Sequence, residues 1–132
     1  MSDSISDPAA VAALAERWIA FWLAPERSPE RSALMPAFND ATRLVAASAD
    51  GAWLFVLEIL RQAPAPTILE ALAAGPLEEM LTLHGAAVIE RLEAEAAANS
   101  VFATLLAGIW QGLMPDDIWQ RVQTAAAGRS LG

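Results

Sequence analysis

The chain has 132 residues, the size of one domain with an ordinary hydrophobic core. It contains no cysteine, so it can hold no disulfide bond, no thiolate metal site and no cysteine nucleophile. Its net charge of −8 disfavours nucleic-acid binding, which depends on basic side chains that neutralise phosphates, and favours attraction to basic partners.

The amino-terminal residues show no targeting or membrane signal. The segment MSDSISDP is acidic and polar, whereas a secretory signal begins with basic residues followed by an apolar run. The longest apolar stretch near this end, residues 11–23, is interrupted by Glu16 and Arg17. It is also shorter than the roughly 20 apolar residues that span a bilayer. We therefore expect a cytoplasmic protein that does not associate with membranes.

Helical start signals and apolar periodicity predict three helices in the first half of the chain. Two helix starts have a capping residue directly followed by proline, at Asp7-Pro8 and Ser28-Pro29. Because Pro36 interrupts the second pattern, we expect a short turn there and a separate helix over residues 37–48. We expect Asp50 to cap the third helix, and Pro64 and Pro66 to end it.

Five further helical patterns follow, with very short junctions between them. They cover residues 67–74, 76–84, 86–98, 100–113 and 115–127. Gly75 suits a left-handed position after the first of these helices, Pro76 starts the second, and Gly85 ends it. The last helix is expected to stop at Gly128.

Glycines and tryptophans in these patterns predict close packing. Gly108 and Gly112 lie inside a predicted helix, where each costs about 1 kcal/mol relative to alanine. We interpret that cost as a sign of close approach by another helix or a tryptophan ring. Leu113 is expected on the core face of the same helix. Most of the five tryptophans should lie in the core, with one or two at the edge of a groove; they are Trp18, Trp22, Trp53, Trp110 and Trp119.

No segment shows the period-two alternation of a strand, so the sequence predicts an all-α single domain. Seven or eight short helices joined by short links form either a compact bundle or a HEAT-like solenoid, and we favour an irregular stack of helical hairpins. Within residues 1–132 we expect amino-terminal helices over 1–49, a main helical core over 50–127 and a frayed tail over 128–132.

Several motifs occur in a defined order along the second half. They are Leu72-Ala73-Ala74-Gly75-Pro76-Leu77-Glu78, His84-Gly85, Gly108-Ile109-Trp110 and Ile118-Trp119-Gln120-Arg121-Val122-Gln123. This set resembles a bacterial all-helical family known as a domain of unknown function, over about residues 53–123. The resemblance implies a helical domain in which these motif residues are structural, and it implies no assigned activity.

His84 is the only histidine, which excludes a metal site with two histidines. Its neighbours are apolar and Gly85 follows it, so we interpret it as a ring packed at a helix end with one nitrogen bonded to a carbonyl or carboxylate. The alternative is a general base in a hydrolytic or metal-dependent enzyme, with Glu78, Glu79 or Glu90 brought near it by the fold.

Acidic residues outnumber basic ones most strongly in the second half. Between residues 70 and 117 eight acids face only Arg91, and the acids are Glu70, Glu78, Glu79, Glu90, Glu93, Glu95, Asp116 and Asp117. The pairs Glu78-Glu79 and Asp116-Asp117 follow helix-starting prolines, where carboxylates stabilise the helix dipole. Adjacent carboxylates point to different faces of a helix, so we predict no metal site and no cofactor.

This charge distribution is either a solvated face or a docking surface. We favour a non-catalytic module that binds a basic protein partner through an interaction surface made of Glu78, Glu79, Glu90, Glu93, Asp116 and Asp117. In a sharper form, it is an inhibitor or immunity-type protein that covers the basic active site of a nuclease or similar toxin. A further alternative is a self-associating structural protein that forms a homodimer through an apolar strip of Trp18, Phe21 and Trp22.

Overall fold

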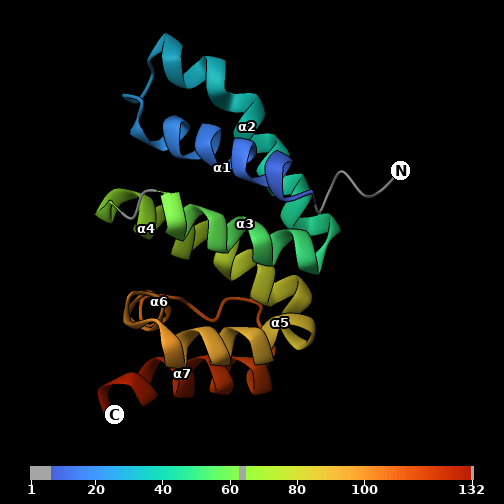
Figure 1. The fold of residues 1–132 in the computed structure, drawn as a ribbon, viewed down its shortest axis with the longest axis vertical. Helices are drawn as coiled ribbons and strands as arrows, with labels where there is room; N and C mark the ends of the chain where they lie inside the picture. Colours follow the sequence, from blue (N-terminus) through green and yellow to red (C-terminus); the bar gives the residue numbers. More distant parts are fainter. Residues whose placement is uncertain (1–6, 63–64, 132) are drawn as a thin grey trace.

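The computed structural model describes residues 7–62 and 65–131, with residues 128–131 in backbone only. All regular structure in these residues is helical, which confirms the all-α class (Figure 1). Helices α1 (Pro8–Leu23) and α2 (Pro29–Ala47) lie at one end of a stack, α3 (Ala49–Gln62) and α4 (Pro66–Leu72) in the middle, and α6 (Ser100–Leu106) and α7 (Asp116–Leu131) at the other end. The long helix α5 (Glu78–Ala98) contacts α3, α6 and α7 and so joins the middle of the stack to its far end.

The predicted starts of the first two helices are confirmed. The Asp7 side chain accepts a hydrogen bond from the amide of Ala9, and the Ser28 hydroxyl accepts one from the amide of Arg31. The predicted break at Pro36 is wrong, because α2 runs through it from end to end. Pro36 is exposed, so water can reach the backbone carbonyl that its missing N–H leaves without a partner.

The predicted helix end at Gly75 is also wrong. Residues Ala73–Leu77 form a π-helical turn, η2, that joins α4 to α5 without a break. Gly112 is the only glycine with positive φ among the described residues, so Gly75 does not use the left-handed region. A π turn changes the hydrogen-bonding step locally, and this lets the chain pass Pro76, which has no N–H to donate. The described residues thus form seven α-helices and one π turn, or six continuous helices.

Two predicted helices, over residues 76–84 and 86–98, form one helix with a kink. The kink is at His84, whose backbone angles (φ −129°, ψ 23°) are not helical. Gly85 next to it allows α7 to come close, since a Cβ at Gly85 would lie 3.0 Å from two carbons of the buried Ile118 side chain. The predicted break therefore marks a real change of direction and a close contact between α5 and α7.

The helix predicted over residues 100–113 is much shorter. Helix α6 ends at Leu106, and residues 107–115 form a loop in which Gly112 has φ 52°. A Cβ at Gly108 would meet only a backbone oxygen at 3.7 Å and one at Gly112 would meet nothing within 4 Å. The predicted close packing at these two glycines is therefore wrong. Helix α7 continues past Gly128 to Leu131, and Gly132 lies outside the described residues, as does the predicted break at Pro64.

One hydrophobic cluster runs through the whole stack. It includes Trp18 of α1, Phe55 of α3, Leu81 of α5, Phe102 of α6 and Val122 of α7, each at most 2% exposed. The amino-terminal helices and the segment 50–127 therefore share one core. None of the helices in the described part of the chain combines the length and apolar composition needed to cross a bilayer.

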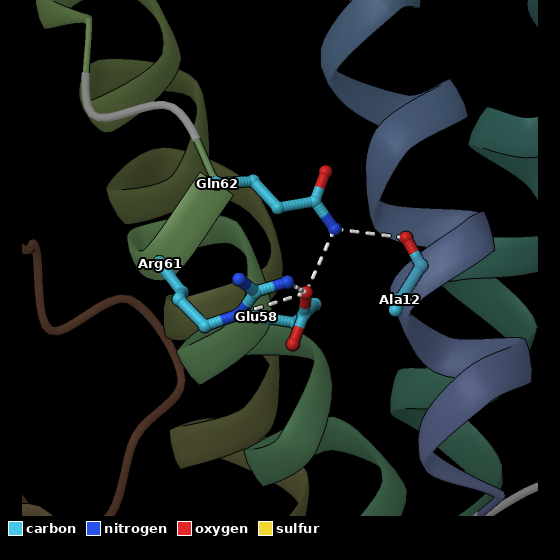
Figure 2. Close-up of polar contacts among 4 residues, drawn as sticks. All are labelled: Ala12, Glu58, Arg61 and Gln62. Atoms are coloured by element: carbon cyan, nitrogen blue, oxygen red, sulfur yellow. Dashed lines mark hydrogen bonds and ion pairs between the residues drawn. The ribbon is translucent and has the colours of Figure 1, made fainter.

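A polar contact also ties α3 to α1 (Figure 2). The Gln62 side-chain amide donates to the backbone oxygen of Ala12 and to a carboxylate oxygen of Glu58, each at 2.9 Å. Glu58 also accepts hydrogen bonds from Arg61. The bonds from Arg61 and then from Gln62 hold the pKa of Glu58 below its ordinary value. This contact helps to fix the position of α1 relative to α3.

Candidate functional site

The loop of residues 107–115 exposes two large apolar side chains. Trp110 is 79% exposed and Leu113 is 90% exposed, although Leu113 was expected in the core. Ile109 and Met114 in the same loop are buried. The chain thus alternates between residues that anchor the loop and residues that it holds out in solvent. Exposed apolar groups of this size are typical of binding surfaces when they lie together.

Hydrogen bonds hold this loop at both ends. The backbone N–H of Trp110 donates to a carboxylate oxygen of Glu78 on α5 at 2.9 Å. The Gln111 side-chain amide donates to the backbone oxygen of Met114 at 3.1 Å and to Asp116 at 2.7 Å. Because the contact with Glu78 involves the backbone, the Trp110 ring is free to contact another molecule. The Trp110 ring is therefore exposed on a loop that hydrogen bonds hold in place.

Two hollows flank Glu78, and both adjoin this loop. The first, which we call the apolar hollow, lies between α4 and α6 and has a volume of about 580 Å³. Leu69, Ala73, Val101, Leu105 and Trp110 are among its lining residues, and Glu70 and Glu78 are the ionisable ones in the described part of its wall. An apolar surface with carboxylates beside it suits a ligand that combines an apolar group with a positive charge.

The second hollow, the aromatic cavity, has a volume of about 380 Å³. Helices α1 and α2 contribute Trp18, Trp22 and Phe38 to its lining, and α5 contributes Glu78 and Glu79. The π turn and the loop tip complete the wall. Sequence reasoning placed Trp22 at a core stripe and Glu79 on a surface, and gave no reason for them to meet.

The six predicted interaction residues divide into two groups. The first group adjoins the loop and its hollows and consists of Glu78, Glu79 and Asp116. The second group surrounds Arg121 on the face made by α5 and α7 and consists of Glu90, Glu93 and Asp117. Glu93 accepts two hydrogen bonds from Arg121, at 2.8 and 2.6 Å, and they lower the pKa of Glu93. Its charge is therefore already paired within the protein, while Glu79, Glu90 and Asp117 make no hydrogen bond or ion pair in the described residues.

His84 lines neither hollow. Its Nε2 lies 2.8 Å from the backbone oxygen of Val45 on α2, and the side chain is partly buried. The predicted bond between one ring nitrogen and a carbonyl is confirmed, whereas the predicted helix end at His84 is instead a kink within α5. No hydrogen bond joins His84 to a carboxylate, and no group of three or more potential metal ligands occurs, among the described residues.

The apolar strip predicted for self-association is not on the surface. Trp18 and Phe21 are 2% and 5% exposed, and Trp22 and Phe21 pack against Phe38 of α2. That strip is therefore part of the contact between α1 and α2. The two most exposed of the large apolar residues described, Trp110 and Leu113, lie instead on the loop, where the signal in the sequence was the closely spaced Gly108, Gly112 and Pro115. The other structural-motif tryptophan, Trp119, is partly buried against the core.

The fold and the loop define a small acidic all-helical protein with a tethered apolar loop beside two hollows. Within that class, the chain belongs to the DUF6869 family, a family of unknown function, which it matches over residues 25–130. The match includes α2 and so extends beyond residues 53–123, the range expected from the motifs. Helix α1 lies outside the match but contributes to the shared core. No curated protein and no solved structure matches the chain.

Proposed function

We propose that the protein is a non-catalytic module that binds another protein, one with a basic surface. The observation that supports this is the tethered loop, which presents Trp110 and Leu113 beside a carboxylate-lined apolar hollow. In its sharper form, the protein is an inhibitor that covers the basic active site of a nuclease or similar toxin. Both forms use the same contact: apolar anchors in the centre and negative charge around them.

Trp110 is large enough to supply much of the binding energy. A tryptophan buries about 150–250 Å² of surface, and at about 25 cal/mol per Å² its burial is worth about 4–6 kcal/mol if it starts fully exposed. At 79% exposure most of that is available, before the costs of association are subtracted. The loop is already held by Glu78 and Asp116, so less ordering entropy is lost when the partner binds.

Charge determines which partners approach. The net charge of −8 attracts a basic surface and accelerates encounter at low salt. Glu79 adds to this, because it makes no hydrogen bond or ion pair within the described part of the chain. Glu93 is not suitable for testing this, since reversing it would break its ion pair with Arg121. Asp117 also lies close to Arg121, so Glu79→Lys is the better charge-reversal variant.

The test is an affinity capture from the native cell lysate with the tagged protein, at low and high salt, read by quantitative mass spectrometry. Trp110→Ala removes the exposed ring and leaves the backbone contact with Glu78 in place. Leu23→Ala is the matched control, because Leu23 is also exposed (59%) but lines neither hollow. For charge, the control is Glu16→Lys, since Glu16 lies about 200° around α1 from the cavity-lining Trp18.

We expect one stoichiometric basic protein that wild type, Leu23→Ala and Glu16→Lys retain. Trp110→Ala and Glu79→Lys should lose this partner, and high salt should weaken its binding. If the partner is an enzyme, wild type should inhibit it and Trp110→Ala should not. Equal capture by Trp110→Ala and wild type would contradict the proposal. Light scattering on the isolated protein distinguishes self-association, in which case Trp110→Ala would convert a dimer to a monomer.

A further inference from the structure

Three aromatic rings from α1 and α2 line the aromatic cavity. The Trp22 ring centre lies 6.0 Å from that of Trp18 at an interplanar angle of 63°, and 6.1 Å from that of Phe38 at 64°. Trp22 and Phe38 are only partly buried. The rings are steeply inclined to each other and form edge-to-face pairs in the wall of the cavity. Aromatic rings carry negative potential on their faces, and such arrangements attract cations.

Carboxylates face the same cavity from α5. Glu78 and Glu79 are the ionisable residues in the described part of its lining, and no basic side chain is among them. Glu78 accepts one hydrogen bond from the Trp110 backbone, while Glu79 has no hydrogen-bond or ion-pair partner among the described residues. Negative charge in this cavity is therefore not neutralised by the protein. An anionic ligand would be repelled, and a neutral apolar ligand would gain nothing from the carboxylates.

A cation already packs on part of this aromatic cluster. The Arg31 guanidinium carbon lies 5.0 Å from the centre of the Phe21 ring and 5.4 Å from that of Trp22, and its Nη2 donates to the Trp22 backbone oxygen at 3.1 Å. Arg31 does not line the cavity. The cluster thus stabilises one positive charge of the protein and leaves the cavity itself without one.

The cavity also has room for a ligand next to the π turn. Gly75 contributes to its wall, and a Cβ there would meet nothing within 4 Å. Thr82 and Gln111 add polar groups to the same wall. We propose that the aromatic cavity binds a small organic cation with an alkylammonium or quaternary ammonium group, which lies among the rings and is paired with Glu79. This inference does not depend on the proposed protein partner.

The test is a titration of the isolated protein with choline, followed by the NMR signals of the tryptophan indole N–H groups. The control ligand is 3,3-dimethylbutan-1-ol, which has the shape of choline with carbon in place of the charged nitrogen. Choline should shift the signals of Trp18 and Trp22 saturably, and the neutral alcohol should bind at least about 10-fold more weakly. A short lysine-containing peptide with blocked ends is titrated in parallel. Comparing its binding with that of choline shows whether the cavity prefers a free small cation or the ammonium group of a protein side chain.

Three variants locate the site. Glu79→Gln should weaken choline binding by about 3- to 30-fold, because it removes the unpaired charge. Gly75→Leu should abolish binding by filling the cavity. Glu90→Gln, which changes another exposed carboxylate away from the cavity, should bind choline as wild type does. The result that overturns the proposal is equal binding of choline and the neutral alcohol, or no saturable shift with choline, in a wild-type protein whose spectrum shows it to be folded.

Discussion

Replacing Gly85 with alanine tests the close contact between α5 and α7. The added methyl carbon would lie 3.0 Å from Cγ1 and Cγ2 of Ile118 and 3.4 Å from its Cδ1. Carbon atoms prefer about 3.5–4.0 Å, so α7 must move away from α5 or Ile118 must leave its preferred rotamer. Ile118 is 5% exposed and has little room to move.

The expected loss of stability follows from two opposing effects. Overpacking of a core by one methyl group costs about 1–3 kcal/mol. Alanine is better than glycine in a helix by up to about 1 kcal/mol, and that gain is smaller beside the kink at His84. We therefore expect Gly85→Ala to lower the free energy of unfolding by about 1–2 kcal/mol.

Urea denaturation followed by tryptophan fluorescence and far-UV circular dichroism measures this change. The matched control is Gly75→Ala, where a Cβ meets nothing within 4 Å and φ is not positive. We expect that variant to be as stable as wild type or more stable, by up to about 1 kcal/mol. Both variants should keep the wild-type dependence of stability on urea concentration, since neither alters the surface exposed on unfolding.

A double-mutant cycle then shows whether Ile118 is the cause. Ile118→Ala alone should cost about 2–5 kcal/mol, because it leaves a cavity. In the double variant the alanine at position 85 occupies part of that cavity. Gly85→Ala should then cost about zero in the Ile118→Ala background, so the two effects should not add. The reasoning is refuted if Gly85→Ala is as stable as Gly75→Ala, or if the effects of Gly85→Ala and Ile118→Ala are additive.

Three further outcomes are expected. Gly112→Ala should lower stability by about 1 kcal/mol in urea denaturation, because φ 52° is strained for any residue with a Cβ; no change would contradict this. Trp110→Ala should change stability by less than about 0.5 kcal/mol in the same assay, and a larger loss would mean that the ring packs on the protein. The pKa of Glu93 is lowered by Arg121, so the pair stabilises the fold above the ordinary pKa of a glutamate and the effect is lost as the pH falls below about 5. Arg121→Ala should therefore destabilise at neutral pH and approach wild type in acid, and an equal effect at both pH values would contradict the assignment.

Local signals predicted the helices well where one residue type has one strong preference. Asp7 and Ser28 were recognised as caps because each is a short polar residue directly before a proline. Such a side chain accepts a hydrogen bond from a backbone N–H of the first helical turn, and proline favours the first position of a helix. Proline and glycine inside the helices misled the prediction at positions 36 and 75. Inside a helix, proline costs about 3 kcal/mol and glycine about 1 kcal/mol relative to alanine, and the rest of the fold offsets these costs where an exposed helix face or a π turn accommodates the residue.

The candidate site was predicted only in part. The carboxylates Glu78, Glu79 and Asp116 were chosen for their charge, and the structure places them next to the loop. The loop itself was predicted as helix, since the apolar spacing of Leu106, Ile109 and Leu113 fits a helical face. Periodicity cannot show that the hydrogen bond from the Trp110 backbone to Glu78 holds this segment out of a helix.

Composition and local pattern alone determined that this protein is a single acidic all-helical domain without cysteine chemistry, because those properties depend on residue counts and on neighbours within one helical turn. Only the tertiary structure decided that Trp18 and Phe21 are buried, that Trp110 and Leu113 are exposed, and that Trp22 shares a cavity with Glu79. The physical reason is that exposure and proximity are set by how helices far apart in the chain pack on one another. Apolar spacing along one helix does not carry that information.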